Sequence, residues 1–163
     1  MLVRKTSEAD IPAIDEFLSR GYPELLKKDY AASVLESALP LITTARPELV
    51  TSDRYFVAVL KDRIISAGGW STERPTGGQE AGLGHIRHVV SDPEYVRLGA
   101  AKAVMAATFE DAHQAGVTRM ECFSTLSAVP FYQAMGFVTL KRVMVPIGPD
   151  GIGFESVLMF AQI

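Results

Sequence analysis

The chain has 163 residues, a formal net charge of −3 and a sequence isoelectric point of about 5.6. Its length suits one domain, expected to span residues 1–163, and 48% hydrophobic with 21% charged residues is typical of a globular rather than a disordered protein. The acidic balance argues against a nucleic-acid partner, because nucleic-acid-binding domains usually carry a basic face.

The first half of the chain predicts a strand, two helices and a two-stranded hairpin. These are expected over residues 2–5, 10–20, 23–39, 54–60 and 63–70. Apolar residues recur at helical spacing in the first helix, and Gly21 is expected to end it. The segment between the second helix and the hairpin reads as irregular.

The second half predicts a strand, a crossover helix and a strand, followed by a short helix and a final hairpin. These are expected over residues 84–91, 97–114, 117–123, 127–135, 137–146 and 154–160. A crossover helix between two strands implies one parallel pair. The predicted fold class is therefore α/β, a mixed and mostly antiparallel seven-stranded sheet with helices on both faces.

Targeting signals and metal motifs are not visible in the sequence. The first ten residues carry charges and no apolar segment, unlike a signal peptide, and no apolar run approaches the ~18 residues that span a bilayer. We therefore expect a cytoplasmic protein without a membrane partner. The single cysteine, Cys122, excludes an internal disulfide and a zinc site built on paired cysteines.

A candidate anion site lies where the crossover helix begins. Asp92-Pro93 ends the preceding strand, because proline removes a backbone donor and restricts the residue before it. The free amides and the dipole of a first helical turn attract phosphate. The pattern is equally consistent with an ordinary helix start in which a glycine allows close packing. The residues of this candidate phosphate cradle are Arg97, Leu98, Gly99, Ala100, Ala101 and Lys102.

The run S-D-P-E-Y-V-R-L-G-A-A-K and the later A-V-P-F-Y-Q-A-M-G-F, together with the element order, resemble the GCN5-related N-acetyltransferase (GNAT) family. The resemblance covers almost the whole chain. It implies an acyl-CoA N-acyltransferase fold with acetyl-CoA as cosubstrate. The spacing of His85, His88 and His113 predicts no metal site. In that family the loop Gln/Arg-x-x-Gly-x-Gly/Ala holds the coenzyme A pyrophosphate through its amides. Gly99 and Ala101 match this loop, whereas Val96 stands where Gln or Arg is usual.

The resemblance also implies the remaining parts of a transferase site. Val89, Val90 and Ser91 would bind pantetheine through backbone groups, where their strand splays from a parallel strand at residues 120–123. One of their amides would polarise the thioester carbonyl, as an oxyanion hole does. Tyr132 would protonate the leaving thiolate, since a tyrosine with pKa near ~10 stays protonated at neutral pH. The alternative for Tyr132 is a packed aromatic whose hydroxyl has another partner.

A base for the acceptor amine is harder to assign. His85 titrates in the useful range, and strand alternation would place it on the same face as Val89 and Ser91, with His88 on the opposite face. A strand histidine is also often just a hydrogen-bonded residue, and the family has no fixed base. Weaker candidates are Glu73, Glu80 and Glu121. Nothing activates Cys122 as a nucleophile, so we expect it to be packed.

The function implied by the resemblance is direct acetyl transfer from acetyl-CoA to a primary amine of a small molecule or peptide, in a ternary complex. A non-catalytic acyl-CoA-binding module and a binder of another phosphate ligand remain alternatives. In the family, residues 19–53 and the final hairpin set the acceptor, and the hairpin supports a possible homodimer. Acidic residues in the first of these segments would suit a cationic amine, although such residues are often only a solvated face. They are Glu24, Asp29, Glu36, Glu48 and Asp53.

Overall fold

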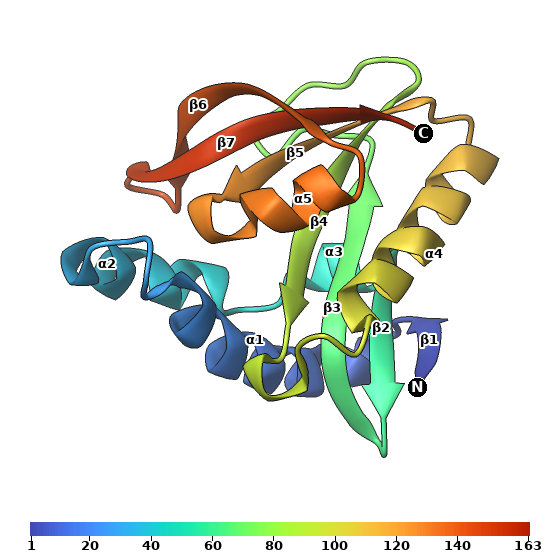
Figure 1. Cartoon of the computed structure of the whole chain (residues 1–163), viewed down its shortest axis with the longest axis horizontal. Coiled ribbons are helices and arrows are strands. Elements are labelled where there is room, and N and C mark those ends of the chain that lie inside the picture. Colours follow the sequence, from blue (N-terminus) through green and yellow to red (C-terminus); the bar gives the residue numbers. More distant parts are fainter.

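A computed structural model describes all 163 residues as one seven-stranded sheet with helices against both faces (Figure 1). The strands lie in the order β1-β2-β3-β4-β5-β7-β6, and every neighbouring pair is antiparallel except β4 and β5. The predicted fold class is confirmed. The strands are β1 (Leu2–Lys5), β2 (Tyr55–Leu60), β3 (Arg63–Ser71), β4 (Leu83–Ser91), β5 (Arg119–Thr125), β6 (Val138–Ile147) and β7 (Ile152–Gln162).

Helices divide between the two faces of the sheet. The helices are α1 (Ile11–Leu26), α2 (Ala32–Ile42), α3 (Pro47–Val50), α4 (Ala100–Gln114) and α5 (Val129–Ala134). On one face, Phe17 of α1 belongs to a buried cluster with Val57 and Val90 of the sheet. On the other, Met105 of α4 and Tyr132 of α5 share a second cluster. None of the helices is both long and apolar enough to cross a bilayer.

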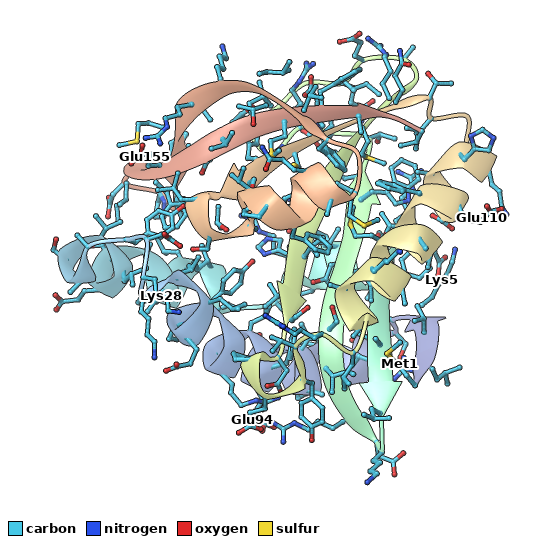
Figure 2. The ribbon with its side chains drawn as sticks, in the orientation of Figure 1. Met1, Lys5, Lys28, Glu94, Glu110 and Glu155 are labelled. Atoms are coloured by element: carbon cyan, nitrogen blue, oxygen red, sulfur yellow. The ribbon has the colours of Figure 1, made fainter.

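Polar contacts of one α4 residue attach this helix to the sheet. Asp111 of α4 accepts hydrogen bonds from Lys5 Nζ at 2.7 Å and from Trp70 Nε1 at 2.8 Å. Figure 2 shows Lys5 beside the end of α4 that carries Glu110. One carboxylate therefore ties the helix to both β1 and β3, which fixes α4 along the sheet.

The first helix is longer than its sequence predicts. Helix α1 runs through Gly21 to Leu26, and α2 begins only at Ala32, so the expected end at Gly21 is wrong. A Cβ built on Gly21 would lie 3.2 Å from Val90 Cγ1 and 3.5 Å from the Ser91 carbonyl oxygen. The glycine serves a close approach of α1 to β4, which local sequence does not reveal.

Strand β4 contains a β-bulge that reverses one prediction. Ala67 pairs with Val90 and Gly69 with Arg87, so two residues of β4 face Gly68 alone, and His88 adopts φ 47°. After the bulge, Val89 packs toward α4, whereas His88 lies on the α1 side. The expectation that His85 shares a face with Val89, with His88 opposite, is wrong, because the extra residue breaks the alternation.

The parallel pair β4 and β5 separates soon after it starts. Only Leu83–His85 of β4 pair with Arg119–Glu121 of β5, although both strands continue beyond those residues. Figure 1 shows the two strands diverging. The predicted splay is present, but its β5 side begins at Cys122, later than expected. The opening that it creates has unpaired backbone along both walls.

Candidate active site

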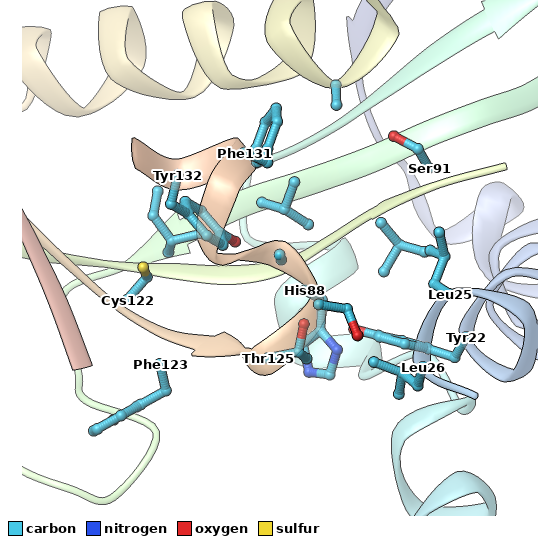
Figure 3. Close-up of a pocket in the computed structure, with 16 residues that line it drawn as sticks. Tyr22, Leu25, Leu26, His88, Ser91, Cys122, Phe123, Thr125, Phe131 and Tyr132 are labelled. Atoms are coloured by element: carbon cyan, nitrogen blue, oxygen red, sulfur yellow. The ribbon is translucent and has the colours of Figure 1, made fainter. Parts of the chain in front are cut away.

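A cavity of about 250 Å³, here called the first cavity, occupies the splay between β4 and β5. Its walls combine Val89–Ser91 of β4, Cys122 of β5 and Ala101 at the start of α4. Figure 3 shows Tyr132 of α5 and Tyr22 of α1 directing their hydroxyls into this space from opposite sides. The structure therefore brings the predicted strand segment, helix start and tyrosine to one opening.

Tyr132 is a candidate proton donor in the first cavity. Its side chain is buried among aromatic rings, with Phe131 and Phe137 at 5.3 and 5.4 Å between ring centroids. Burial, and secondarily the neighbouring Cys122, raises the pKa of Tyr132 well above its ordinary value. The hydroxyl is therefore protonated at neutral pH, as a general acid requires.

The backbone of β4 lines the opposite wall. Ser91 pairs with Ser66 of β3, and the next residue, Asp92, donates its amide to Ile65 at 2.9 Å. Hydrogen-bonding groups alternate between the two edges of an antiparallel strand, so those of Ser91 point away from β3 and toward the splay. This edge of β4 can bond an extended ligand as a neighbouring strand would.

The candidate phosphate cradle begins as a loop rather than as helix. Helix α4 starts at Ala100, three residues later than predicted, because Arg97 and Gly99 adopt φ 66° and 76°. No amide from Val96 to Lys102 donates a hydrogen bond within the chain. Open space surrounds the position of a Cβ on Gly99. These consecutive free amides, with the helix dipole behind them, can bind an anion.

A buried carboxylate holds the loop that leads into the cradle. Asp92 is fully buried and accepts hydrogen bonds from Arg20 and Arg63, both at 2.9 Å, and from the Glu94 amide at 3.0 Å. Burial opposes its ionisation, but the Glu94 amide and the two arginines lower the pKa of Asp92 overall. Asp92 thereby joins α1, β3 and the end of β4 (Figure 2 labels Glu94 at this turn).

A second cavity, of about 190 Å³, adjoins the first. It lies between the α2 end, β4 and the β6–β7 hairpin, with Ile42, Arg87 and Pro146 among its walls. Two arginines line it and no acidic residue does. The residues that line both cavities are Tyr22, Ile86, His88, Phe123 and Thr125. A reaction between ligands in the two cavities would take place at this shared wall.

The two strand histidines differ in their access to these cavities. His85 lines neither and is 1% exposed, with Nδ1 3.5 Å from Glu121 and a buried Nε2 that has no hydrogen-bond partner. His88 lines both, and its carbonyl accepts a hydrogen bond from Tyr55 at 2.9 Å. Burial, together with nearby arginines, lowers the pKa of each imidazole to about 4.

The other candidate groups occupy less suitable positions. Burial and the nearby Glu121 raise the pKa of the Cys122 thiol, so it lines the first cavity as a protonated side chain. Glu80 pairs with Arg119 at 2.6 Å, outside both cavities. No group of three or more His, Cys, Asp or Glu side chains is arranged to hold a metal ion.

Comparison with protein families gives one decisive match. A family described as the acetyltransferase (GNAT) domain matches residues 28–153. The chain belongs to the GNAT family. A comparison with curated proteins found no significant match. The family match runs from α2 to the first residues of β7, and so includes the splay, the cradle and Tyr132.

Solved GNAT structures share this fold at low sequence identity. One is a GCN5-related N-acetyltransferase from Rhodopseudomonas palustris, with TM-score 0.78, 16% identity, and coverage of 99% of this chain and 95% of that one. Another is the PaiA N-acetyltransferase from Thermoplasma acidophilum in complex with coenzyme A, with TM-score 0.74, 13% identity and coverage of 99% and 98%. Rv2747 from Mycobacterium tuberculosis, in complex with coenzyme A and NLQ, has TM-score 0.60, 16% identity and coverage of 100% and 99%.

Sequence reasoning missed several residues that line the cavities of this GNAT domain. Tyr22 directly follows Gly21, which predicts a helix end, and Arg46 lies in a segment that the sequence predicts to be irregular. His88 was assigned to the wrong face. The one available signal was Gly68-Gly69 inside a strand, since adjacent glycines in a strand often mark a bulge.

Proposed function

We propose that the protein transfers an acetyl group from acetyl-CoA to a primary amine by direct attack in a ternary complex. The observation that carries this proposal is the pair of adjoining cavities. The first combines Tyr132 with the splayed backbone of Val89–Ser91, and the second is open to another ligand. Two solved structures of the same fold contain coenzyme A, which supports the same occupant here.

Coenzyme A would bind along β4 and end at the start of α4. In this proposal the pantetheine arm bonds the edge of Val89–Ser91, and the pyrophosphate accepts hydrogen bonds from the free amides of residues 97–102. Arg97 and Lys102 add positive charge. The backbone supplies most of these contacts, so Val96 at the position of the usual Gln or Arg does not prevent binding.

The reaction needs few side chains. The neutral amine forms a bond to the thioester carbonyl carbon, and a β4 amide stabilises the resulting oxyanion. The carbon–sulfur bond then breaks, the thiolate takes the Tyr132 hydroxyl proton, and the new amide nitrogen loses its extra proton to solvent. Tyr132 then takes a proton from solvent, which returns the enzyme to its starting protonation state.

The acceptor must lose a proton before it attacks, because an alkylammonium has a pKa near ~10. His85 is the first candidate base from sequence, but direct transfer requires a contact of roughly 2.6–3.2 Å, and His85 reaches neither cavity. We propose that the positive charges of Arg46 and Arg87 lower the pKa of the bound ammonium instead, since like charge disfavours the charged form. The rate should then rise with pH above neutrality.

Calorimetry with coenzyme A, ATP and NAD tests the binding half of the proposal. Coenzyme A should bind at micromolar concentration and the other two much more weakly. Thiol release from acetyl-CoA with a panel of amines tests the catalytic half. Failure of coenzyme A to bind would refute both halves, and binding without thiol release for any amine would identify a non-catalytic module.

A further inference from the structure

The second cavity carries uncompensated positive charge. Arg46 and Arg87 both line it, and neither forms an ion pair with a carboxylate. The acidic residues of segment 19–53, which suggest a cationic acceptor from sequence, are absent from its walls. They are Glu24, Asp29, Glu36, Glu48 and Asp53.

Both arginines are positioned by the fold. Arg87 lies on β4, where its Nη1 donates to Ser71 Oγ at 3.0 Å, while its remaining guanidinium donors have no partner in the chain. Arg46 is the N-cap residue of α3. The amide of the preceding residue, Ala45, donates to the Asp15 carboxylate of α1 at 2.6 Å, which fixes the backbone beside the cavity.

Electrostatics within the site agree with this arrangement. Burial lowers the pKa of Arg87, and the charge of Arg46 lowers it further, while Glu48 and Glu73 act weakly in the opposite direction. Burial first, and then the same two arginines, also lower the pKa of His88, which lies at the wall between the cavities. The two arginines therefore set a positive potential that one bound carboxylate would relieve only in part, so the remaining charge still disfavours protonation of the acceptor amine.

We propose that the acceptor amine carries a carboxylate, bound by Arg46 and Arg87, and an apolar portion packed in the rest of the second cavity. This rests on the proposed acetyl transfer. An arginine matches a carboxylate with two parallel hydrogen bonds. The other walls are mainly apolar, including Leu41, Ile42 and Phe154. The volume of about 190 Å³ lies below the ~300–1,000 Å³ of drug-sized ligand sites, which favours one small molecule such as an amino acid.

Paired acceptors that differ at the carboxylate, compared per concentration of neutral amine, provide the test. Apolar L-amino acids are assayed beside their carboxamides in acetyl-CoA-dependent thiol release. Loss of the charged partner should lower kcat/KM for the carboxamides by about 10-fold to 100-fold. Equal or better turnover of the carboxamides, or of amines without any acid, overturns the inference.

Substitutions test whether Arg46 and Arg87 cause the preference for the acid over the carboxamide. Arg46→Glu changes an exposed side chain, so it should fold, and it should abolish the preference for the acid while leaving coenzyme A affinity unchanged. Arg87→Gln should act in the same direction. Arg142→Gln, at an exposed ion pair with Glu155 outside both cavities, is the control and should keep the preference. Retention of the preference in Arg46→Glu refutes the assignment.

A binding measurement separates this inference from the proposed function. N-acetylated apolar amino acids and their N-acetyl carboxamides are titrated into the coenzyme A-loaded protein. Preferential binding of the acids, lost in Arg46→Glu, supports the site even without turnover. Equal or absent binding overturns it. Failure of coenzyme A itself to bind refutes the proposed function first, whereas transfer to amines lacking a carboxylate refutes only this inference.

Discussion

The two cavities are built in different ways. The first presents the backbone edge of β4 and the start of α4, together with apolar and tyrosine side chains from α1, β5 and α5. The second is formed by side chains from α1, α2, the residues before α3, β4 and the final hairpin. The first arrangement suits a constant cosubstrate, because backbone groups do not change with the side chain. The second suits a ligand that differs from one enzyme to another.

The sharpest test of the first cavity is Tyr132→Phe. Loss of the proton donor should lower kcat by about 100-fold or more, because general acid catalysis contributes 10²–10⁴-fold. Coenzyme A affinity should stay within a factor of about 3, since the substitution removes one neutral hydroxyl. Tyr95→Phe, whose hydroxyl has no hydrogen-bond partner in the chain, is the matched control. An equal loss in both variants, or a change only in affinity, would remove Tyr132 from the reaction.

His85 and His88 should make the free energy of unfolding depend on pH. In the unfolded chain a histidine takes up a proton near pH 6.5, whereas His85 and His88 stay neutral in the folded protein until pH about 4. The unfolded state binds more protons between these values, so stability should fall as pH drops from 6.5 to 4. The loss is at most about 3 kcal/mol per histidine.

Urea unfolding at a series of pH values measures this effect. His85→Gln and His88→Gln should each flatten the decline in unfolding free energy between pH 6.5 and 4. His113→Gln, on the exposed end of α4, is the matched control. Because His88 alone lines the cavities, only its substitution should also change acceptor KM. An unaltered pH dependence in both variants would contradict their burial in the neutral form.

Gly99→Val tests the cradle. A β-branched residue at φ 76° should strain the loop by about 1–2 kcal/mol and raise the coenzyme A Kd by about 10-fold. Gly116→Val introduces the same strain at φ 85°, at the other end of α4, where a Cβ is equally unobstructed. Calorimetry should show weakened binding only for Gly99→Val. Equal affinities for coenzyme A in the two variants would remove the cradle from the binding site.

Val96→Gln should have the smallest effect. The substitution restores the residue type usual in the family at an exposed position. Since the amides of residues 97–102 carry the binding in our proposal, affinity for coenzyme A should improve by no more than about 3-fold. A gain of tenfold or more would show that the side chain, rather than the backbone, dominates pyrophosphate binding.

Local sequence patterns predicted much of the fold and the outline of the first cavity. Alternation and helical spacing gave the element order, and Gly99 and Tyr132 lie in short runs that can be read directly. The errors arose where distant segments meet. Gly21 looked like a helix end because its contact with Val90 is tertiary, and His88 was misplaced because the bulge depends on β3. No local sequence pattern predicts that Arg46 and Arg87 line the same cavity.

The wall between the cavities also limits how acceptor preference can change. Leu41 and the Val145–Gly148 segment line only the second cavity, so substitutions there alter one ligand site and leave the other intact. Tyr22 and His88 line both, and a Cβ on the adjacent Gly21 would lie 3.2 Å from Val90 Cγ1, so a larger residue there requires Val90 to shift. New specificities should therefore evolve through α2 and the hairpin, while α1 stays nearly invariant where it crosses β4.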